Sequence, residues 1–220
     1  MNLLKNEWTA KEIHLNRAKE FAEQWHYAQG AGDLAHKSYG LFYKKDLKTL
    51  HGIAIWNPPA IGAAKWTNPD EHQSVLGLSR FCLVDDRPDN SGSFLISQSI
   101  KQLNKCRWKV LLTFADTAKG HNGGLYRASN WLYRGLTKKN PVYWDSEGRT
   151  VSCKRGAKTY NRQEMLDRGY IYKGRYAKHR FTYNTLRRNM CNPSLGKQYD
   201  LMFNKKGKIV IPEKNIEEAC

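Results

Sequence analysis

The sequence predicts an α/β fold in which helices cover a central sheet. Segments with the apolar spacing of helices and of strands alternate along the first 135 residues, a pattern typical of this class. One segment, residues 109–115, is an almost continuous apolar run, as expected for a strand that is covered on both faces. The 220 residues are enough for one or two domains with a sizeable core.

The first elements follow from the positions of apolar and turn-forming residues. A helix is expected over residues 13–25, where apolar side chains recur at helical spacing and glycines follow. Strands are expected over residues 39–43 and 51–56, which a polar turn joins, and two prolines end the second strand. A loop rich in Gly, Pro and Asn then runs to about residue 73.

Four further elements complete the predicted core. They are a strand over 75–84, a helix over 94–103, a strand over 109–115 and a helix over 124–133. Beyond them the pattern is less regular, although residues 199–203 and 208–211 have the pattern of a hairpin. We treat residues 1–140 as a core and residues 141–220 as a basic region packed on it, two parts of one compact unit.

Positive charge dominates the composition and is concentrated in one stretch. Lys and Arg number 37 against 20 Asp and Glu, a formal net charge of +17. Residues 118–208 contain 21 of the basic and 5 of the acidic side chains, with aromatic residues between them. Cations neutralise a phosphate backbone and aromatic faces stack on bases, so we expect contact with nucleic acid. A solvated basic face is the ordinary alternative, and an anionic membrane surface a weaker one.

Nothing in the sequence indicates export or membrane insertion. The N-terminus lacks the apolar segment of a signal peptide, and no run of about 18 apolar residues occurs. The five cysteines are far apart, without the paired spacing of a zinc site, and are expected to be reduced thiols. We therefore expect a cytoplasmic protein without a membrane partner.

Two positions offer chemistry at the ends of predicted elements. His26 lies between two large aromatic residues at the end of the first helix, and histidine is the usual acid or base near neutral pH. Asp116 ends the apolar strand, where open α/β sheets bind ligands, and a segment with His121, two glycines and aromatic residues follows. A packed core histidine and a capping aspartate are the alternatives.

The turn from Arg87 to Ser93 is a candidate anion site. Exposed N–H groups at a helix start bind anions, and Arg87 would add a cation. Asn and Ser are also common N-cap residues, so local evidence alone favours an ordinary helix start.

Familiar catalytic signatures are missing. The sequence contains no GxSxG, P-loop, GxGxxG or HExxH motif, and the H-x-E and PCxxC pair of zinc base deaminases is absent. The segment Asn57-Pro58-Pro59-Ala60 approaches the NPPY pattern of DNA methyltransferases but lacks its aromatic residue. Motifs of these kinds therefore assign no function.

Four segments of the sequence resemble the phage Mom proteins, in order and spacing, over roughly residues 18–137. They are Phe21-x-x-x-Trp25-His26-Tyr27, Leu78-Ser79-Arg80, Phe114-Ala115-Asp116 and His121-x-Gly123-Gly124-x-Tyr126-x-Ala128-x-x-Trp131-x-Tyr133-x-Gly135. The last two segments are the most specific, whereas the basic C-terminal region is similar only in character.

The resemblance implies a fold and an activity. It implies a GNAT-like mixed central sheet with covering helices and a basic C-terminal extension. It also implies a bacteriophage enzyme that converts adenine N6 of double-stranded DNA to a carbamoylmethyl (acetamido) form, in the host cytoplasm, and so protects the DNA from restriction. The alternatives are a GNAT-like N-acyltransferase acting on tRNA, protein or a small-molecule amine, and a basic DNA-binding protein without catalysis.

The resemblance leaves the donor of the transferred group open. The usual glycine-rich R/Q-x-x-G-x-G/A signature of the cofactor site is replaced by Arg87-Pro88-Asp89-Asn90-Ser91-Gly92-Ser93. A thioester donor delivers an acyl carbon, whereas a carbamoylmethyl group is joined through a methylene carbon. Acyl-CoA and a glycine-derived donor, as a small molecule or an aminoacyl carrier, both stay open. Iron has been proposed for such proteins, and His26 and Asp116 are ligand types that it uses.

These considerations assign candidate roles to individual residues. The catalytic group is expected to be His26 with Asp116, together with Tyr27, Arg80 and Tyr126. The donor's anionic part is expected at Arg87, Asn90, Ser91, Gly92 and Ser93. Contacts to DNA are expected from Trp25, Trp131, Tyr133, Lys154, Arg155, Lys178, Arg180, Arg187 and Arg188.

Overall fold

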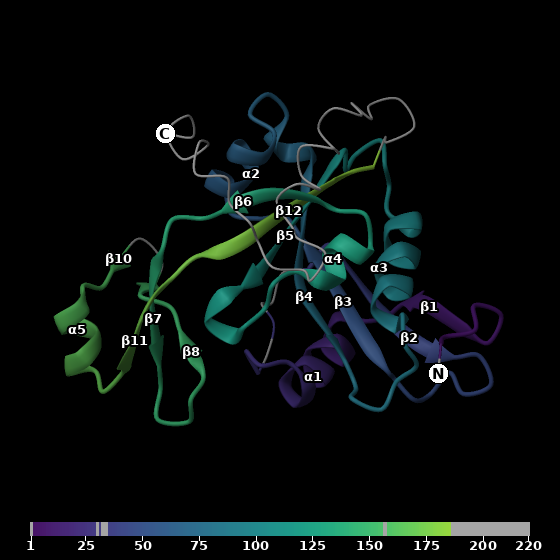
Figure 1. Ribbon diagram of the computed structural model, residues 1–220, viewed down its shortest axis with the longest axis horizontal. Coiled ribbons are helices and arrows are strands. Elements are labelled where there is room, and N and C mark those ends of the chain that lie inside the picture. Colours follow the sequence, from purple (N-terminus) through teal and green to yellow (C-terminus); the bar gives the residue numbers. More distant parts are fainter. Residues whose placement is uncertain (1, 30, 32–34, 156–157, 186–220) are drawn as a thin grey trace.

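Seven strands form the central sheet of the computed structural model, which describes residues 2–29, 31, 35–155 and 158–185 (Figure 1). Their order across the sheet is β1-β2-β3-β4-β5-β12-β6. The strands are β1 (Trp8–Glu12), β2 (Lys37–Tyr43), β3 (Gly52–Asn57), β4 (Val75–Leu83), β5 (Val110–Asp116), β6 (Leu132–Leu136) and β12 (Lys178–Asn184). The sheet is mixed, because β4 and β5 are parallel and the other neighbours are antiparallel.

The two parallel strands separate part of the way along their length. They pair from Val75 opposite Val110 to Gly77 opposite Leu112, although both strands continue further. The hydroxyl of Thr113 still donates to the carbonyl of Leu78 (3.2 Å) at the point of separation. Beyond this point β4 and β5 are no longer paired with each other.

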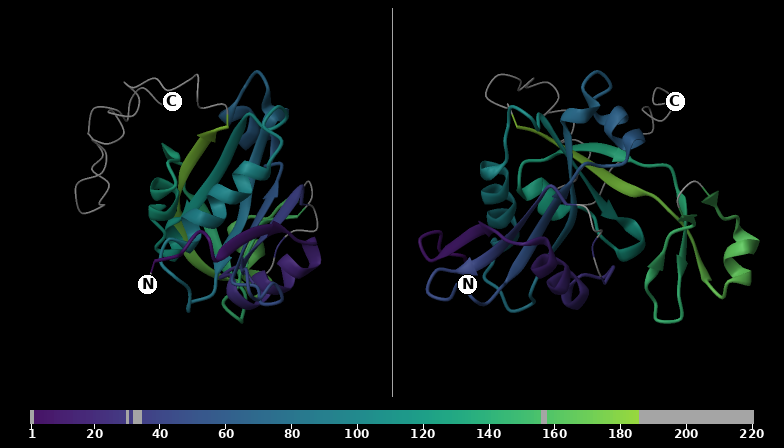
Figure 2. Two further views of the ribbon diagram at one scale, coloured as in Figure 1. Left: turned by 90° about the vertical axis from the view of Figure 1, so that its right-hand side faces the viewer. Right: turned by 180° about the vertical axis from the view of Figure 1, so that it is seen from behind.

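Helices cover both faces of the sheet. Since the side chains of a strand alternate between the two faces, one strand packs against helices on both sides. Helix α1 (Leu15–Trp25) packs its buried residues against Ile53 and Ile55 of β3. The alternate residues of β3, Ala54 and Trp56, belong to the core cluster under α3 (Ser91–Gln102), on the opposite face (Figure 2). Short elements complete the core, namely α2 (Ile61–Thr67), η1 (His72–Ser74), η2 (Thr117–Lys119) and α4 (Gly124–Ala128).

Residues 138–176 project from one side of the core and are called the lobe here (Figures 1 and 2). A three-stranded sheet in the order β11-β7-β8 forms its centre. The elements of the lobe are β7 (Asn140–Trp144), β8 (Thr150–Val151), β9 (Lys154–Arg155), β10 (Lys158–Thr159), α5 (Arg162–Asp167) and β11 (Ile171–Tyr176). Strand β12 follows β11 directly and returns the chain to the central sheet, between β5 and β6.

Most elements that the sequence predicts in the first 116 residues are present. The helix over 13–25 and the strands over 39–43, 51–56, 75–84 and 109–115 correspond to α1, β2, β3, β4 and β5, and the helix over 94–103 to α3. The loop expected up to residue 73 contains the short helices α2 and η1, and β1 was not predicted.

The helix expected over residues 124–133 is shorter than predicted. Asn130 has a φ of 61°, a left-handed conformation that ends α4, and Leu132–Leu136 forms strand β6. The predicted hairpin at 199–211 lies outside the described residues. In the part of the chain that the structure describes, no helix is long and apolar enough to cross a membrane.

Candidate active site

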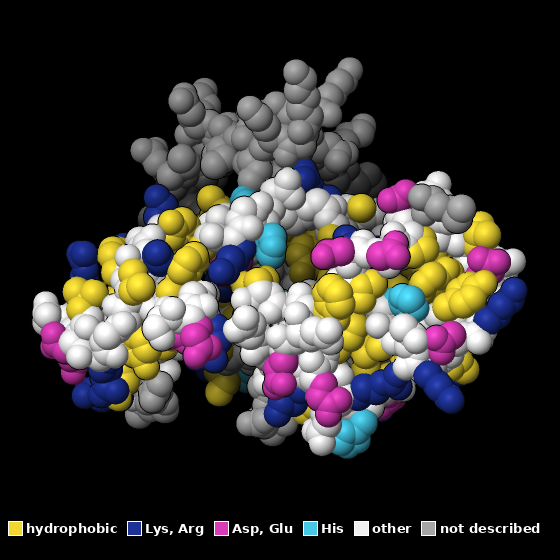
Figure 3. All heavy atoms as spheres, turned by 90° about the horizontal axis from the view of Figure 1, so that it is seen from below, with side chains coloured by type: hydrophobic (Ala, Val, Ile, Leu, Met, Phe, Trp, Pro, Cys, Tyr) yellow, Lys and Arg dark blue, Asp and Glu magenta, His cyan; other side chains and the backbone are white. Residues whose placement is uncertain are grey.

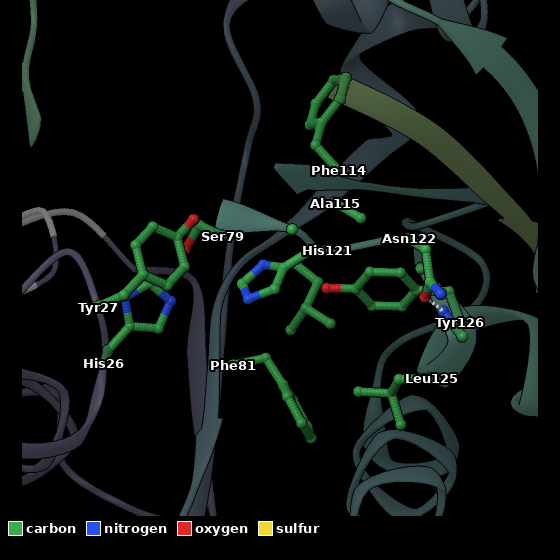
Figure 4. A pocket seen from close by; sticks show the side chains of 14 residues that line it. His26, Tyr27, Ser79, Phe81, Phe114, Ala115, His121, Asn122, Leu125 and Tyr126 are labelled. Carbon is green, nitrogen blue, oxygen red and sulfur yellow. Dashed lines mark hydrogen bonds between the residues drawn. The ribbon is translucent and has the colours of Figure 1, made fainter. Parts of the chain in front are cut away.

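A cavity of about 400 Å³ lies where β4 and β5 separate. Ser79 and Phe81 of β4 and Phe114 of β5 line it, so both strands contribute walls. Most of the remaining lining comes from the end of α1, from the segment between β5 and α4, and from α4 itself (Figure 4). The volume is typical of a site for a small ligand.

His26 is buried at one end of this cavity, as the residue that ends α1. The backbone N–H of Ala28 donates to its Nδ1 (3.1 Å), so the neutral ring carries its proton on Nε2. Burial, and then the positive charge of Arg80, lower the pKa of His26 to about 4. The ring is therefore neutral near pH 7, with its proton on Nε2. The acid or base role that the sequence suggested stays a prediction.

His121 lines the same cavity, in the segment after Asp116 that the sequence singled out without giving His121 a role of its own. Its backbone N–H donates to the carbonyl of Asp116 (3.1 Å), which fixes the loop that follows β5. Its ring meets that of Tyr27 edge-on at 5.3 Å between centroids, and Tyr27 stacks obliquely on His26 at 4.3 Å. Its place in a glycine-rich segment directly after the central apolar strand was the signal that pointed to this position.

Tyr126 approaches the cavity from the side opposite His26 and Tyr27 (Figure 4). Burial raises the pKa of its phenol above the usual value, and a hydrogen bond with Thr113 only partly offsets this effect. Near neutral pH the group is therefore protonated and can donate a hydrogen bond to a ligand in the cavity, although burial also makes it a weaker acid.

The position of Tyr126 depends on a close approach between α4 and β12. Gly123, directly before α4, has a φ of 75°, and a Cβ there would lie 2.2 Å from the ring of Phe181. The same Phe181 ring contacts that of Tyr126 at 5.3 Å between centroids. Glycine at position 123 thus allows β12 to support the wall that carries Tyr126.

Asp116 does not form the expected pair with His26. Its Oδ2 makes an ion pair with Nζ of Lys178 (2.9 Å), and its Oδ1 accepts from the backbone N–H of Ala118 (3.0 Å). No hydrogen bond joins it to His26 among the described residues. Through these contacts Asp116 orders the turn that leads to His121, and its charge also contributes to raising the pKa of Tyr27.

Arg80 is outside the lining of the cavity but close to His26. It lies on β4 next to Ser79, whose carbonyl accepts a hydrogen bond from its Nη1 (2.8 Å). Its guanidinium is among the causes that lower the pKa of His26. The structure thus places Arg80 where its charge disfavours protonation of His26, and its predicted role in the catalytic group stays a prediction.

The described residues do not fit an iron site. Among them, no group of three or more His, Cys, Asp and Glu side chains could hold a metal ion. Of the two ligands considered from the sequence, His26 has Nδ1 occupied by the N–H of Ala28, and the Asp116 carboxylate is engaged by Lys178. The expectation of iron is therefore not supported, and we derive no step through a metal.

A second cavity, of about 550 Å³, adjoins the first at the start of α3. It includes Arg87 and residues 90–93, as predicted from the sequence, and shares Phe81 and Leu125 with the first cavity. Asn90 has a φ of 66° and stands at a glycine position of the usual signature, so its left-handed conformation replaces that of glycine.

The start of α3 has no side-chain cap. The Asn90 side chain donates to Oδ1 of Asn2 (3.1 Å), and the Ser91 and Ser93 hydroxyls donate to backbone carbonyls. Of the first-turn N–H groups, that of Ser91 donates to the carbonyl of Pro88 (3.3 Å), so those of Gly92 and Ser93 are the ones that an anionic ligand could use. Arg87 donates to the carbonyl of Val84 (2.7 Å) and so shapes the turn.

Two aromatic residues expected to stack on a base are core residues instead. Trp131 is 4% exposed and stacks on Trp56, while Tyr133 is 5% exposed and its hydroxyl is bonded to Nδ1 of His179 (3.0 Å). Trp25 and Tyr27 are exposed by about two fifths, and of these only Tyr27 lines the cavity. Tyr27 is therefore one of the aromatic residues that a ligand in the cavity would meet.

The cations expected to hold DNA have different surroundings. Lys154 is exposed, and Lys178 pairs with Asp116 while its side chain is half exposed. The guanidinium of Arg180 lies 3.4 Å from the ring centroid of Trp66, and burial lowers its pKa. The side chain of Arg155, and Arg187 and Arg188, lie outside what the structure describes.

The sequence matches the model of the Mom protein family over residues 7–197. A solved structure of similar fold is a probable GNAT-family acetyltransferase from Chromobacterium violaceum, at 8% identity and a TM-score of 0.50, covering 84% of this chain and 86% of that one. Another is the ribosomal-protein-S18-alanine N-acetyltransferase from Escherichia coli, at 12% identity and a TM-score of 0.47, covering 81% and 94%.

A third is the spermidine N-acetyltransferase from Vibrio cholerae in complex with CoA and spermine, at 8% identity and a TM-score of 0.47, covering 82% of this chain and 97% of that one. No curated protein matches the sequence. At these identities the similarity concerns the fold alone. It confirms the predicted GNAT-like mixed sheet with covering helices.

Proposed function

The chain belongs to the Mom protein family, and on this premise we propose that it transfers a small group to N6 of adenine in double-stranded DNA. The product is the carbamoylmethyl form, which in a phage-infected cell would shield the DNA from host restriction in the cytoplasm. The observation that carries the proposal is one cavity, between separated parallel strands, that brings together His26, His121 and Tyr126.

The cavity suits a planar base. N6 of adenine is paired inside the duplex, so the nucleotide must leave the stack at a cost of a few kcal/mol. Phe81, Phe114 and Tyr27 provide aromatic walls against which an extruded base can pack. The half-exposed Tyr27 marks the end of the cavity at which such a base would enter.

The three polar side chains have separate tasks in this scheme. Nε2–H of His26 donates a hydrogen bond that orients the base or the donor. N6 attacks the transferable carbon of the donor, and His121 accepts the proton that N6 loses. As the bond from this carbon to its leaving group breaks, Tyr126 protonates the leaving group.

The donor is proposed to bind along the second cavity, with its anionic part at the start of α3. Its reactive end would then reach the first cavity past Phe81 and Leu125, which line both. An acyl-CoA would place an acetyl group on N6, whereas a glycine-derived donor that reacts at a methylene carbon would give the carbamoylmethyl group. The two products differ by one nitrogen and one hydrogen atom.

Mass spectrometry of nucleosides tests the proposal. DNA from cells that express the wild-type chain should contain a deoxyadenosine heavier by a carbamoylmethyl group. Replacement Tyr126→Phe removes the proposed proton donor and should lower the modified fraction by about 10²–10⁴-fold. Tyr43→Phe, on β2 and outside both cavities, is the matched control and should modify DNA as the wild type does.

The possible results distinguish the classes of function. A mass increase by an acetyl group on deoxyadenosine would indicate that the donor is an acyl-CoA and not a glycine-derived compound that reacts at a methylene carbon. Unmodified DNA with an acylated tRNA, protein or small amine would contradict the DNA substrate and favour a general N-acyltransferase. Unmodified DNA together with tight, salt-sensitive DNA binding would favour a protein that acts by occupancy alone.

A further inference from the structure

A run of alternating aromatic rings and lysines leads from the cavity to the lobe. We call Tyr27, Lys119, Trp144 and Lys173 the seam. Nζ of Lys119 lies 5.6 Å from the ring centroid of Tyr27 and 4.5 Å from that of Trp144, so it links the cavity to β7. Nζ of Lys173, on β11, lies 4.5 Å from the same Trp144 ring.

The two lysines of the seam keep their charge available. Within the described residues, neither Lys119 nor Lys173 makes an ion pair with an acidic side chain, in contrast to Lys178, which pairs with Asp116. Both ammonium groups lie 4.5 Å from one ring centroid, so they are at most twice that distance apart. This upper limit is close to the Debye length of about 8 Å at physiological ionic strength, so the two charges act on one short stretch of surface.

The surroundings of the seam are also basic. Residues 138–184 contain 12 Lys and Arg against 4 Asp and Glu. Figure 3 shows the face on which core and lobe meet, with a hollow near its centre, a histidine and basic side chains on the lobe side of the hollow, and acidic side chains on its other side. The basic side chains near the hollow therefore lie toward the lobe.

We propose that the seam binds the DNA strand that carries the target nucleotide. The inference rests on the proposed function and adds to it the surface that holds the substrate. Lys119 and Lys173 neutralise phosphates that flank the target, and the exposed ring of Tyr27 receives the base as it leaves the stack. Trp144 holds both ammonium groups in place by cation–π contact.

The alternation of rings and cations favours a nucleic-acid strand over an acidic protein. A nucleic-acid strand presents phosphates at regular intervals with bases between them. The phosphates can contact the lysines and the bases can stack on the aromatic rings. The position of Tyr27 at the cavity ties the seam to a base that is presented for reaction. The seam would therefore hold the strand on either side of an extruded nucleotide.

The test is the salt dependence of DNA binding by the double variant Lys119→Gln/Lys173→Gln. If each lysine neutralises one phosphate, the slope of log Kobs against log[salt] should become shallower by about 2. The matched control is Lys44→Gln/Lys45→Gln, which removes the same charge from the exposed turn between β2 and β3 and should keep the wild-type slope. Thermal unfolding of each variant verifies that the fold is intact.

Binding and modification are measured separately, so the two proposals can fail independently. If the slope becomes shallower in the seam variant but not in the control variant, the proposal that the seam binds DNA is supported, whether or not the wild type modifies adenine. An unchanged slope in a folded seam variant overturns the seam proposal, even if the wild type does modify DNA. If duplex RNA, titrated in parallel, loses affinity in the seam variant while DNA does not, the assigned partner is also overturned.

Discussion

His26 owes its neutral state to its surroundings in the fold. Most of its ring is removed from water, and Arg80 adds a positive charge nearby, so the protonated form is disfavoured. With Nδ1 occupied by the N–H of Ala28, the only polar atom that the ring offers to a ligand is Nε2–H. A neutral imidazole that donates a hydrogen bond suits the stabilisation of a developing negative charge.

The lowered pKa of His26 predicts a pH dependence of stability. In the folded state His26 stays neutral down to about pH 4, whereas in the unfolded chain it takes up a proton near pH 6.5. The contribution of the neutral ring to the unfolding free energy is therefore fully present above pH 6.5 and is lost as the pH falls toward 4. Replacement His26→Gln should therefore reduce the loss of unfolding free energy between pH 7.5 and 5 by up to about 2 kcal/mol.

Urea denaturation at the two pH values measures this effect. His72→Gln, a replacement in η1 outside both cavities, is the control and should retain the wild-type difference. An equal pH dependence in the wild type and in His26→Gln would show that His26 titrates normally in the folded protein.

Single residues of the site were predicted from chain position or from the family resemblance. His26 was chosen for its place at the end of a predicted helix and Tyr126 from the resemblance and its side-chain chemistry, and both line the cavity. The prediction that Trp131 and Tyr133 stack on a base was wrong, because both side chains are buried in the core. Residue type alone does not show which face of β6 and of the turn before it packs against the core. The engagement of Asp116 by Lys178 depends on a partner 62 positions later in the sequence, as their numbers show.

Helix α4 shows how an element directs a side chain into the cavity. It has five residues, so tertiary contacts rather than helix propensity must hold it in place. Gly123 supplies the left-handed turn at its start and the room for Phe181 beneath it. The orientation of Tyr126 is therefore set by a strand from the far end of the described chain.

Replacement Gly123→Ala should destabilise the protein by about 2–4 kcal/mol, because it adds backbone strain and a clash with Phe181. Gly62→Ala in α2 has open space around the added carbon and should stay within about 1 kcal/mol of the wild type. Urea denaturation measures both changes. A Gly123→Ala protein as stable as the wild type would mean that α4 does not depend on this close approach.

Elements with a strong local pattern were predictable, and those that depend on tertiary contacts were not. The apolar run of β5 and the spacing in α1 and α3 are local signals. Strand β1 has five residues with only two buried, and it is held by pairing with β2. The apolar spacing that suggested a helix up to residue 133 continues past Asn130, whose left-handed backbone ends the helix. The local pattern therefore did not reveal where α4 ends.

The whole molecule depends on a strand that arrives late in the sequence. Strand β12 pairs with β5 over seven residues and with β6 on its other side, so the central sheet is incomplete without it. The order of strands along the chain gave no indication of this insertion, because pairing between distant segments is not encoded in local periodicity. The basic region beyond residue 140 therefore contributes a central strand as well as surface charge.

A chain shortened to residues 1–140 should accordingly fail to fold cooperatively. It would leave β6 without its partner and would expose Trp131 and one side of β5 to water. Thermal unfolding followed by circular dichroism and by tryptophan fluorescence should show a sharp transition for the full chain and a gradual one for the shortened chain. A cooperative transition in both would contradict the role assigned to β12.

The late position of β12 has a consequence for biosynthesis. While the protein is being translated, β5 leaves the ribosome long before its neighbour and must wait with an unpaired edge, which is prone to aggregation. The support for Tyr126 and the attachment of the lobe arise together when β12 docks. A nascent chain would thus gain catalytic and substrate-holding capacity in one final folding event, and an interrupted translation product would have neither.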